Sequence, residues 1–434
     1  MLPALITPIP GPRSRALAAR LRRYESRNVT FLADDWPIFW EHAEGVNVWD
    51  ADGNRFLDLT SAFGVSGLGH TNAAVRAALT AQSAEVLHAM GDVHPTAVKT
   101  ELCERLSELT FERWGAGEGK VILGNSGFEA VEAALKTSLL RTGRAGVIAF
   151  KEGYHGLGLG ALTATALPFF REPFRAQLAN FATFLAYPAG KGAALEALRS
   201  EIDRTVSEHE IGCILVEPLQ GRGGCIVPPA ELLPMLRTAC DAHGLLLVLD
   251  EIYTGFNRTG ALFACEHSSV VPDVICLGKA LTSGFPLSAC VGRAEVMDAW
   301  PVSCGEALHT STFLGNPLGC AMALASLAQH ARPETACLVR ERGSRLKAAL
   351  ESLASPRIRE IRGLGLMLGM ELVEADGKPA TELAIHIVKR ALGDGIVLLA
   401  DSPASNVLSF APPFTISDEE IAFIAEKLGR YLAA

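Results

Sequence analysis

Three features that would place the chain in other classes of protein are missing or scarce. None of the ten cysteines forms a C-x-x-C pair, which argues against structural zinc or a disulfide framework and predicts reduced thiols in the cytoplasm. The longest apolar runs, such as Leu245–Leu249, are far shorter than the roughly 20 residues of a membrane-spanning helix. Lysine and arginine number 39 against 48 aspartate and glutamate, so no basic excess is available for nucleic acid. We therefore predict a soluble globular protein with neither nucleic acid nor a membrane as a partner.

The middle of the chain alternates short apolar runs with amphipathic stretches. Several runs are apolar throughout, which is typical of parallel strands covered by helices on both faces. Residues 127–140 and 229–244 have helical patterns. The alternation predicts an α/β fold with a doubly wound sheet, and 434 residues suffice for two domains or one large unit. The expected strands are Val121–Leu123, Gly146–Phe150, Ile211–Val216, Leu245–Leu249 and Val274–Leu277.

The two ends of the chain predict a smaller α+β domain. Near the C-terminus, Ser417 with Glu420 three residues later forms a capping box that announces a last helix. Near the N-terminus, Asp52-Gly53 joins two β-like runs as a hairpin, which either belongs with the C-terminal domain or crosses to a partner subunit. The other expected elements of this domain are helices at 344–353 and 381–392 and strands at 357–362, 366–373 and 407–413.

The clearest candidate for chemistry is Asp250, which ends a fully apolar run. Proteins with parallel sheets bind ligands at the carboxyl ends of their strands. One alternative is a structural aspartate that caps the following turn, and another is the Walker-B acid of a nucleotide hydrolase. The second alternative requires G-x-x-x-x-G-K-[ST], and no Gly-Lys in the chain is followed by Ser or Thr.

Lys279 follows the next predicted strand, 279 − 250 = 29 residues after Asp250. Because one βαβ step takes about 30 residues, we expect both groups at the same edge of the sheet. A lysine there is either a nucleophilic amine activated by desolvation, as Schiff-base enzymes require, or a side chain that merely reaches out to solvent.

A third candidate lies at residues 121–136, where a predicted strand, a short loop and a predicted helix follow one another. The free N–H groups at the helix start, the Ser126 hydroxyl and the close approach allowed by Gly127 suit a phosphate group. The alternative is an ordinary helix cap, for which Ser126 alone suffices. Further along, Tyr154 of Tyr154-His155-Gly156 offers a ring that could stack on a flat cofactor.

Together these residues predict a ligand with a phosphate, a protonatable ring nitrogen and an aldehyde. Asp250 would pair with the ring nitrogen, Lys279 with the aldehyde, and Ser126 and Gly127 with the phosphate. Pyridoxal 5'-phosphate carries all three groups, and its proteins hold it with a Schiff-base lysine and an aspartate at the pyridinium nitrogen.

Ten blocks of the sequence, in order, resemble the class III pyridoxal-phosphate aminotransferases of fold type I, which include ornithine, acetylornithine and 4-aminobutyrate aminotransferases. The resemblance runs from about Phe31 to the C-terminus. It implies a large cofactor-binding domain (61–318) with a mainly parallel seven-stranded sheet flanked by helices, and a smaller α+β domain from both chain ends (1–60 and 319–434). It also implies a homodimer with shared active sites. The blocks are EGVNVWDADGNRFLD, GLGH, NSGFEAVEAALK, YHG, VEPLQGRGG, LDEIYTGFNRTG, GKALTSGFPLSA, STFLGNP, RGLGLMLGMEL and FAPPFTIS.

The resemblance assigns roles to individual residues. Lys279 would form the Schiff base and move a proton between the substrate Cα and cofactor C4′, while Asp250 would keep the ring nitrogen protonated. Tyr154 would stack on the ring, and Glu217 would lie near the cofactor edge. Tyr253 stands where many members have a glutamine that contacts the phenolic oxygen, a contact that a phenol could replace. The phosphate ligands would be Ser126, Gly127, Phe128 and, from the neighbouring subunit, Thr312.

Two departures from the family pattern concern substrate recognition. Where much of the family has an arginine that grips the substrate α-carboxylate, this chain has Ser409. Where those members have the glutamate that neutralises this arginine, the chain has Arg222. Losing only one partner would leave an unpaired charge near the cofactor, which is costly. The double change therefore predicts a rebuilt substrate pocket, with Arg222 and Ser409 as substrate residues.

We predict an aminotransferase that moves an amino group from an amine or an ω- or β-amino acid to a keto acid in two half-reactions, through pyridoxamine phosphate. The alternative within the fold is an isomerase, either an aminomutase or an amino-acid racemase, which would use the same lysine and aspartate. A cofactor-binding regulatory protein without turnover is a third hypothesis, which a replaced lysine would favour, but Lys279 is present.

Overall fold

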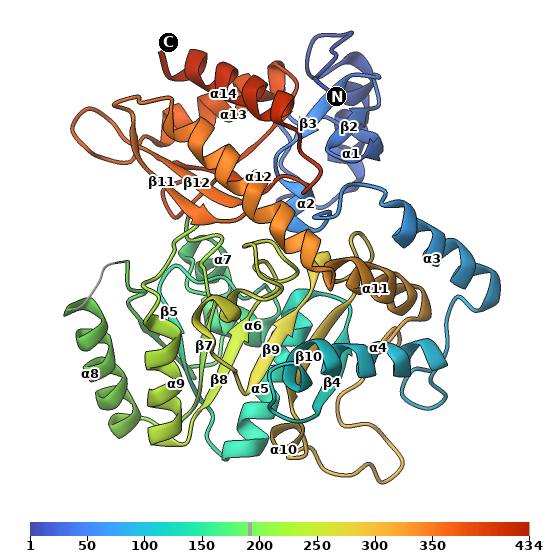
Figure 1. Cartoon of the computed structure of the whole chain (residues 1–434), viewed down its shortest axis with the longest axis vertical. Coiled ribbons are helices and arrows are strands. Elements are labelled where there is room, and N and C mark those ends of the chain that lie inside the picture. The colour runs from blue at the N-terminus through green and yellow to red at the C-terminus, as the bar shows by residue number, and fades with distance from the viewer. Residues whose placement is uncertain (190–192, 434) are drawn as a thin grey trace. The chain divides into compact units, whose positions relative to one another are not determined.

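The computed structural model describes residues 1–189 and 193–433, which form two compact units (Figure 1). Unit 1 consists of Met1–Asn72 and Leu338–Ala434, and unit 2 of Ala73–Cys337. These limits lie later in the chain than the predicted 60/61 and 318/319. At the second limit, the reason is that α11 (Pro317–His330) packs against α3 (Ala73–Glu85) and α4 (Ala97–Ser107), which all belong to unit 2.

Unit 2 contains the predicted seven-stranded, mainly parallel sheet, in the order β4-β10-β9-β8-β7-β5-β6. Only β10 runs antiparallel to its neighbours, β4 and β9. The five predicted strands are present, while β6 and β10 were missed. The strands are β4 (Gly119–Gly124), β5 (Gly146–Phe150), β6 (Ala182–Leu185), β7 (Ile211–Val216), β8 (Leu246–Asp250), β9 (Val274–Leu277) and β10 (Ser288–Arg293).

Helices cover both faces of this sheet. Besides α3, α4 and α11, they are α5 (Gly127–Thr142), α6 (Leu159–Ala164), α7 (Pro168–Arg171), α8 (Ala193–Glu208), α9 (Leu232–His243) and α10 (Ala294–Met297). Leu247 and Leu249 belong to a core shared with α4, α8, α9 and α11. Val248 and Cys276 belong to a second core shared with α5, α6 and α10. Successive residues of a strand point to opposite faces, so a strand buried on both sides must be apolar throughout.

Unit 1 contains both ends of the chain, and the N-terminal hairpin shares a sheet with a C-terminal strand. Strand β3 (Arg55–Asp58) pairs with β2 (Asn47–Asp50) across the Asp52-Gly53 turn, and on its other side with β13 (Ile396–Val397). The hairpin therefore belongs with the C-terminal segments. The other elements of this unit are α1 (Pro12–Tyr24), β1 (Trp40–Glu44), α2 (Ser61–Gly64), β11 (Ile358–Leu364), β12 (Met367–Leu372), α13 (Thr381–Gly393), β14 (Leu399–Asp401), β15 (Val407–Phe410) and α14 (Asp418–Ala433).

The capping box is confirmed at α14, where the Ser417 N–H donates to Glu420 Oε2 at 2.8 Å and the Glu420 N–H donates to Ser417 Oγ at 3.3 Å. The predicted helix at 344–353 is the second half of a longer helix, α12 (Pro333–Glu351), which passes from unit 2 into unit 1.

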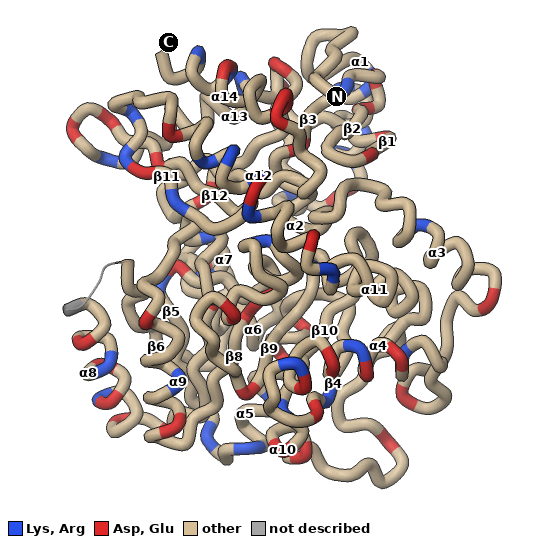
Figure 2. Tube along the Cα trace, viewed as in Figure 1, with Lys and Arg blue, Asp and Glu red and all other residues tan. Residues whose placement is uncertain are grey.

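The charged residues of both signs are mixed along the surface helices (Figure 2). On α8, for example, Arg204 forms ion pairs with Glu201 and Glu208, one turn before and one turn after it. Such exposed pairs contribute little to stability, at most about 1 kcal/mol each. Within the described residues, no helix combines the length and the apolar character that crossing a membrane requires.

Candidate active site

Asp250 and Lys279 lie at the carboxyl edge of neighbouring strands, as their spacing predicted. Asp250 is the last residue of β8 and pairs in register with Cys276 of β9. Lys279 comes three residues after Cys276 and has a left-handed backbone, with φ at 43°. This conformation costs a residue with a side chain about 1–2 kcal/mol. Strained residues of this kind are concentrated at functional sites, where the surrounding structure holds them in place.

The Asp250 carboxylate is buried and held on two sides. Its Oδ2 lies 2.8 Å from His155 Nδ1, and its Oδ1 accepts the Ile252 N–H at 3.1 Å. His155 is buried as well. Because an ionised carboxylate can only accept, the imidazole Nδ1–H is the donor in this pair. His155 therefore fixes the orientation of the carboxylate while leaving lone pairs for a further partner.

We expect His155→Ala to lower the rate of the amine half-reaction about 10- to 100-fold, the effect of losing a hydrogen bond to a charged group. His155→Asn should recover most of the rate, because its amide can donate to Asp250 in place of Nδ1. Stopped-flow measurement of single turnovers would test this. Equal rates in wild type and His155→Ala would show that the pair does not matter for the reaction.

The Lys279 side chain lies against the ring of Tyr253. Its Nζ is 4.4 Å from the ring centroid, which is a cation–π contact. Tyr253 occupies the position predicted to contact the phenolic oxygen of the cofactor, and the structure brings it to the amine that would carry the cofactor. Both residues come from the loops that follow β8 and β9.

The start of α5 has the features expected of a phosphate site. Ser126 precedes the helix in an extended conformation, but its side chain makes no capping hydrogen bond. Its Oγ is buried and has no hydrogen-bond partner in the described part of the chain. The ordinary helix cap that we considered is therefore absent. A buried hydroxyl without a partner is costly, and a phosphate oxygen would satisfy it.

Neighbouring segments pack tightly against this helix start. A side chain at Gly127 would lie 3.0 Å from the Ile252 side chain, so a residue larger than glycine would push Ile252 away. A side chain at Gly156 would overlap Phe128. Four segments that are far apart in the sequence thus converge, namely 126–128, 154–156, 250–253 and 278–279. They contain most of the residues predicted to bind the cofactor.

Glu217, just after β7, is buried and orders the surrounding backbone. Its Oε1 accepts the Tyr154 N–H at 2.9 Å and its Oε2 accepts the Gly221 N–H at 3.0 Å. Burial raises the pKa of Glu217, and the nearby Asp250 carboxylate adds to this, whereas His155 opposes it. Glu217 therefore positions Tyr154 and the turn that carries Arg222.

The raised pKa of Glu217 predicts a pH dependence of stability. Between the unfolded pKa and the higher folded pKa, the folded protein holds the extra proton, so stability falls as the pH rises. Glu217→Gln cannot titrate. The free energy of unfolding of this variant should therefore increase relative to that of wild type as the pH rises above about 4.5. Urea unfolding at several pH values would measure this, and parallel curves for the two proteins would contradict it.

Arg222 lies over two aromatic rings. Its guanidinium carbon is 5.2 Å from the centroid of Tyr154 and 5.6 Å from that of Phe170, and these two rings contact each other edge to face at 5.5 Å. Within residues 1–189 and 193–433, Arg222 forms no ion pair or hydrogen bond. In this part of the chain, Arg222 is therefore not paired with the nearby acid Glu217.

Two further predicted site residues, Ser409 and Thr312, lie outside the four converging segments. Ser409 belongs to unit 1, where it is buried on β15 and pairs in register with Gly369 and Leu399. Thr312 is exposed in the segment between α10 and α11. Its predicted contact with the phosphate of a neighbouring subunit stays a prediction.

Comparison with known proteins identifies the family. Residues 31–432 match the model of the class-III aminotransferases. The chain belongs to this family. It is 35% identical to a 4-aminobutyrate aminotransferase of Mycobacterium leprae, with 99% of this chain and 97% of the relative aligned. It is also 36% identical to the [LysW]-aminoadipate semialdehyde transaminase of Deinococcus radiodurans, over 90% of this chain and 84% of the relative.

A solved structure gives the same result for the fold. The amine transaminase from an uncultivated Pseudomonas species, in its PLP-bound form, matches 94% of this chain and 98% of its own with a TM-score of 0.85 and 27% identity. The protein is thus an aminotransferase with the fold type I architecture, and its cofactor is pyridoxal 5'-phosphate. The comparisons do not favour the isomerase alternative.

The residues of this aminotransferase fit the cofactor. The unpartnered Ser126 hydroxyl suits the phosphate, Asp250 has lone pairs left for the ring nitrogen, and Lys279 is at the same sheet edge. Two residues of the site, His155 and Phe170, were not predicted from the sequence. His155 was named only as a neighbour of Tyr154, although a histidine directly after a predicted stacking aromatic was a usable signal. Nothing in the sequence pointed to Phe170, which reaches Tyr154 and Arg222 from α7.

Proposed function

We propose that this aminotransferase takes its amino group from an ω-amino acid, a β-amino acid or an amine without a nearby carboxylate, and passes it to a keto acid. The observation that carries the proposal is the Arg222 guanidinium, which is held over Tyr154 and Phe170 without an acidic partner in the described residues. Its donors remain available for a carboxylate. The relatives named for 4-aminobutyrate, an ω-amino acid, and for amines support the same direction.

We assign the reaction steps to residues of this chain as follows. The bound cofactor supplies an aldehyde and an electron sink. Lys279 Nζ would hold the cofactor at its aldehyde carbon and would serve as the base that moves a proton between the substrate Cα and cofactor C4′. Asp250, oriented by His155, would hold the proton on the ring nitrogen. Ser126, Gly127 and Phe128 would hold the phosphate, with Tyr154 on the ring and Glu217 and Tyr253 at its edges.

We also propose a homodimer in which Thr312 of each subunit reaches the phosphate of the other. Large exposed apolar side chains of unit 2 support this, because exposed apolar side chains on adjoining segments are typical of an interaction site. Several lie in the segment that carries Thr312 and in the segment packed beside it. They are Leu87, Met90, Val93, Leu308 and Phe313.

For the compartment, we propose the cytoplasm, as the sequence predicted. All ten cysteines are free thiols. Burial raises the pKa of Cys213 to about 11 and that of Cys320 to about 12. These thiols therefore remain protonated and unreactive, which suits structural rather than redox roles.

The donor proposal predicts a specific pattern among variants. We expect Arg222→Ala to weaken the binding of carboxylate-bearing donors by about 1–3 kcal/mol, which is the cost of losing a hydrogen bond to a charge. The reaction with simple amines should be unchanged. Ser409→Arg should raise the rate of the half-reaction with α-amino acids as donors. The measurement is the rate of cofactor bleaching with each donor in the absence of a keto acid.

If α-amino acids are the best donors of the unmodified enzyme, and neither substitution changes the order of donors, the proposed substrate class is wrong. The two variants serve as controls for each other, because one removes a guanidinium in unit 2 and the other adds one in unit 1. A general loss of folding would affect all donors alike.

A further inference from the structure

The segment that carries Thr312 is held to its own chain by three side-chain contacts on consecutive residues. Lys136 Nζ of α5 lies 3.1 Å from His309 Nδ1, Thr310 Oγ1 donates to Asp92 Oδ2 at 2.7 Å, and Asn125 Nδ2 donates to Ser311 Oγ at 3.3 Å. The next residue, Thr312, is exposed. We call residues 309–316 the Thr312 loop.

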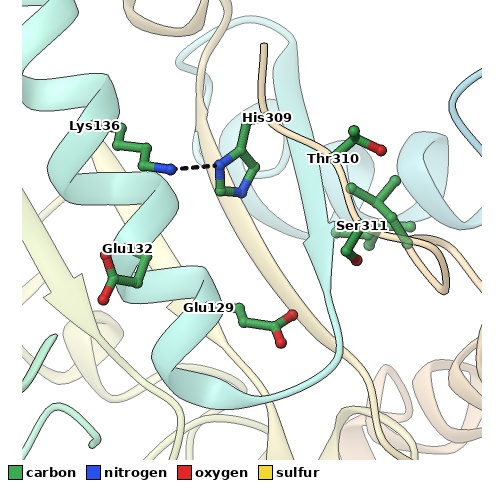
Figure 3. Close-up of a pocket in the computed structure, with 8 residues that line it drawn as sticks. Glu129, Glu132, Lys136, His309, Thr310 and Ser311 are labelled. Atoms are coloured by element: carbon green, nitrogen blue, oxygen red, sulfur yellow. Dashed lines mark hydrogen bonds between the residues drawn. The ribbon is translucent and has the colours of Figure 1, made fainter. Parts of the chain in front are cut away.

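The lysine contact is consistent with a neutral histidine. Burial and the nearby Lys136 ammonium lower the pKa of His309, whereas Glu129 and Glu132 act in the opposite direction. The neutral ring can accept the lysine hydrogen bond at Nδ1. Figure 3 shows Lys136 pointing directly at His309, and both residues line a cavity that Glu129, Glu132, Thr310 and Ser311 also line.

A second set of contacts fixes the other end of the Thr312 loop. Phe313 packs against His88, with ring centroids 5.1 Å apart, and the Asn316 amide donates to the Leu87 carbonyl at 3.3 Å. A side chain at Gly91 would overlap the Leu314 carbonyl, so the two backbones are in direct contact there. Thr312 thus lies between two anchored stretches.

The Asn125 contact joins this loop to the phosphate site of the same chain. Asn125 directly precedes Ser126, and the Glu129 carboxylate of α5 accepts its N–H at 2.6 Å and its side-chain amide at 3.2 Å. The side-chain amide of Asn125 therefore faces both Glu129, in the first turn of α5, and Ser311, in the Thr312 loop. A shift of either segment would disturb the other.

We propose that Ser311 is a positioning residue, which through Asn125 ties Thr312 to the phosphate-binding turn of its own subunit and so couples the two cofactor sites of the dimer. The inference rests on the proposed function, because it assumes that Thr312 reaches the phosphate of the partner. It adds that the position of Thr312 depends on the turn at Asn125–Gly127. The first site to bind cofactor would then prepare the second.

The first test measures cofactor affinity of the apoenzyme, with pyridoxal 5'-phosphate and with pyridoxal, which lacks the phosphate. Ser311→Ala should raise the Kd for pyridoxal phosphate about threefold to tenfold, the effect of one hydrogen bond, and leave the Kd for pyridoxal unchanged. The matched control is Ser303→Ala in the same segment, whose hydroxyl bonds the Glu306 carbonyl. This variant should change neither Kd. Light scattering checks that each protein is a dimer.

Thr312→Ala separates the failure of the inference from that of the proposed function. If Thr312→Ala weakens the binding of pyridoxal phosphate and Ser311→Ala does not, the inference is overturned while the proposed role of Thr312 stands. If Thr312→Ala changes nothing, or the protein is a monomer, the proposed shared site fails and the inference fails with it.

Hybrid dimers locate the effect. One subunit carries Lys279→Ala, so only the other subunit develops the visible absorbance of cofactor bound to lysine. Placing Ser311→Ala on the subunit with Lys279→Ala should weaken cofactor binding in the unmodified partner, because that partner depends on the altered Thr312 loop. If the loss appears only when Ser311→Ala is on the absorbing subunit, Ser311 acts within its own subunit and the coupling is disproved.

Discussion

Replacing Lys279 by alanine is expected to lower the rate of both half-reactions by more than about 10⁴-fold. General acid–base catalysis alone contributes about 10²–10⁴, and this variant also removes the nucleophile that bonds the cofactor. The fold and the phosphate site should survive, because Ser126 and the start of α5 belong to a different segment. Single-turnover kinetics with an amine donor would measure the loss.

Two companion variants make this result specific to the amine. Lys279→Arg keeps a cation against the Tyr253 ring but cannot form a Schiff base, so it should be as inactive as Lys279→Ala. Lys120→Ala removes a lysine that is paired with Asp298 at the surface and should leave the rate unchanged. Turnover by purified Lys279→Ala at more than about one per cent of wild type would remove Lys279 from its proposed role.

The sequence predicted those parts of the fold that local patterns determine. Strand β7 was predicted with its observed ends, because each of its residues is apolar and it is buried on both faces. Strand β10 was missed. It lies at the antiparallel position between β4 and β9, and its sequence, SACVGR, contains glycine and small residues that local propensity does not favour in a strand. Its place is decided by its neighbours in the sheet.

The site shows the same division between local pattern and tertiary contact. Asp250 and Lys279 could be paired from sequence because Asp250 ends one predicted strand, Lys279 follows the next one, and the two residues are 29 positions apart. The contact of His155 with Asp250 joins residues that are 95 positions apart, and no local pattern encodes such a distance. The same holds for Arg222 and Phe170, whose contact depends on how α7 and the turn after β7 fold over Tyr154.

The Asp250→Asn variant should leave the protein folded and lower the rate of the proton-transfer step about 10²- to 10³-fold, or about 3–4 kcal/mol. This is the size of effect observed when one preorganised group that stabilises developing charge is removed. Asparagine keeps the shape and an oxygen that can accept the Ile252 N–H. It cannot hold the charge that keeps the ring nitrogen protonated, so the electron sink is weakened. The rate at which the donor Cα–H bond is broken reports on this step, and it can be measured by comparing a normal donor with a deuterated one.

The neighbouring acid provides the control. Glu251 is also buried, but its carboxylate accepts the Ala264 and Cys265 N–H groups and the Thr254 hydroxyl, which are contacts of the fold. Glu251→Gln should therefore lower the free energy of unfolding by about 1–3 kcal/mol with little effect on the chemical step, the reverse of Asp250→Asn.

Combining Asp250→Asn with His155→Ala should reduce the rate by less than the product of the two single reductions, because both substitutions act through one hydrogen bond. Additive losses would show that His155 has a role separate from Asp250, and a near-normal rate in Asp250→Asn would show that this carboxylate is structural.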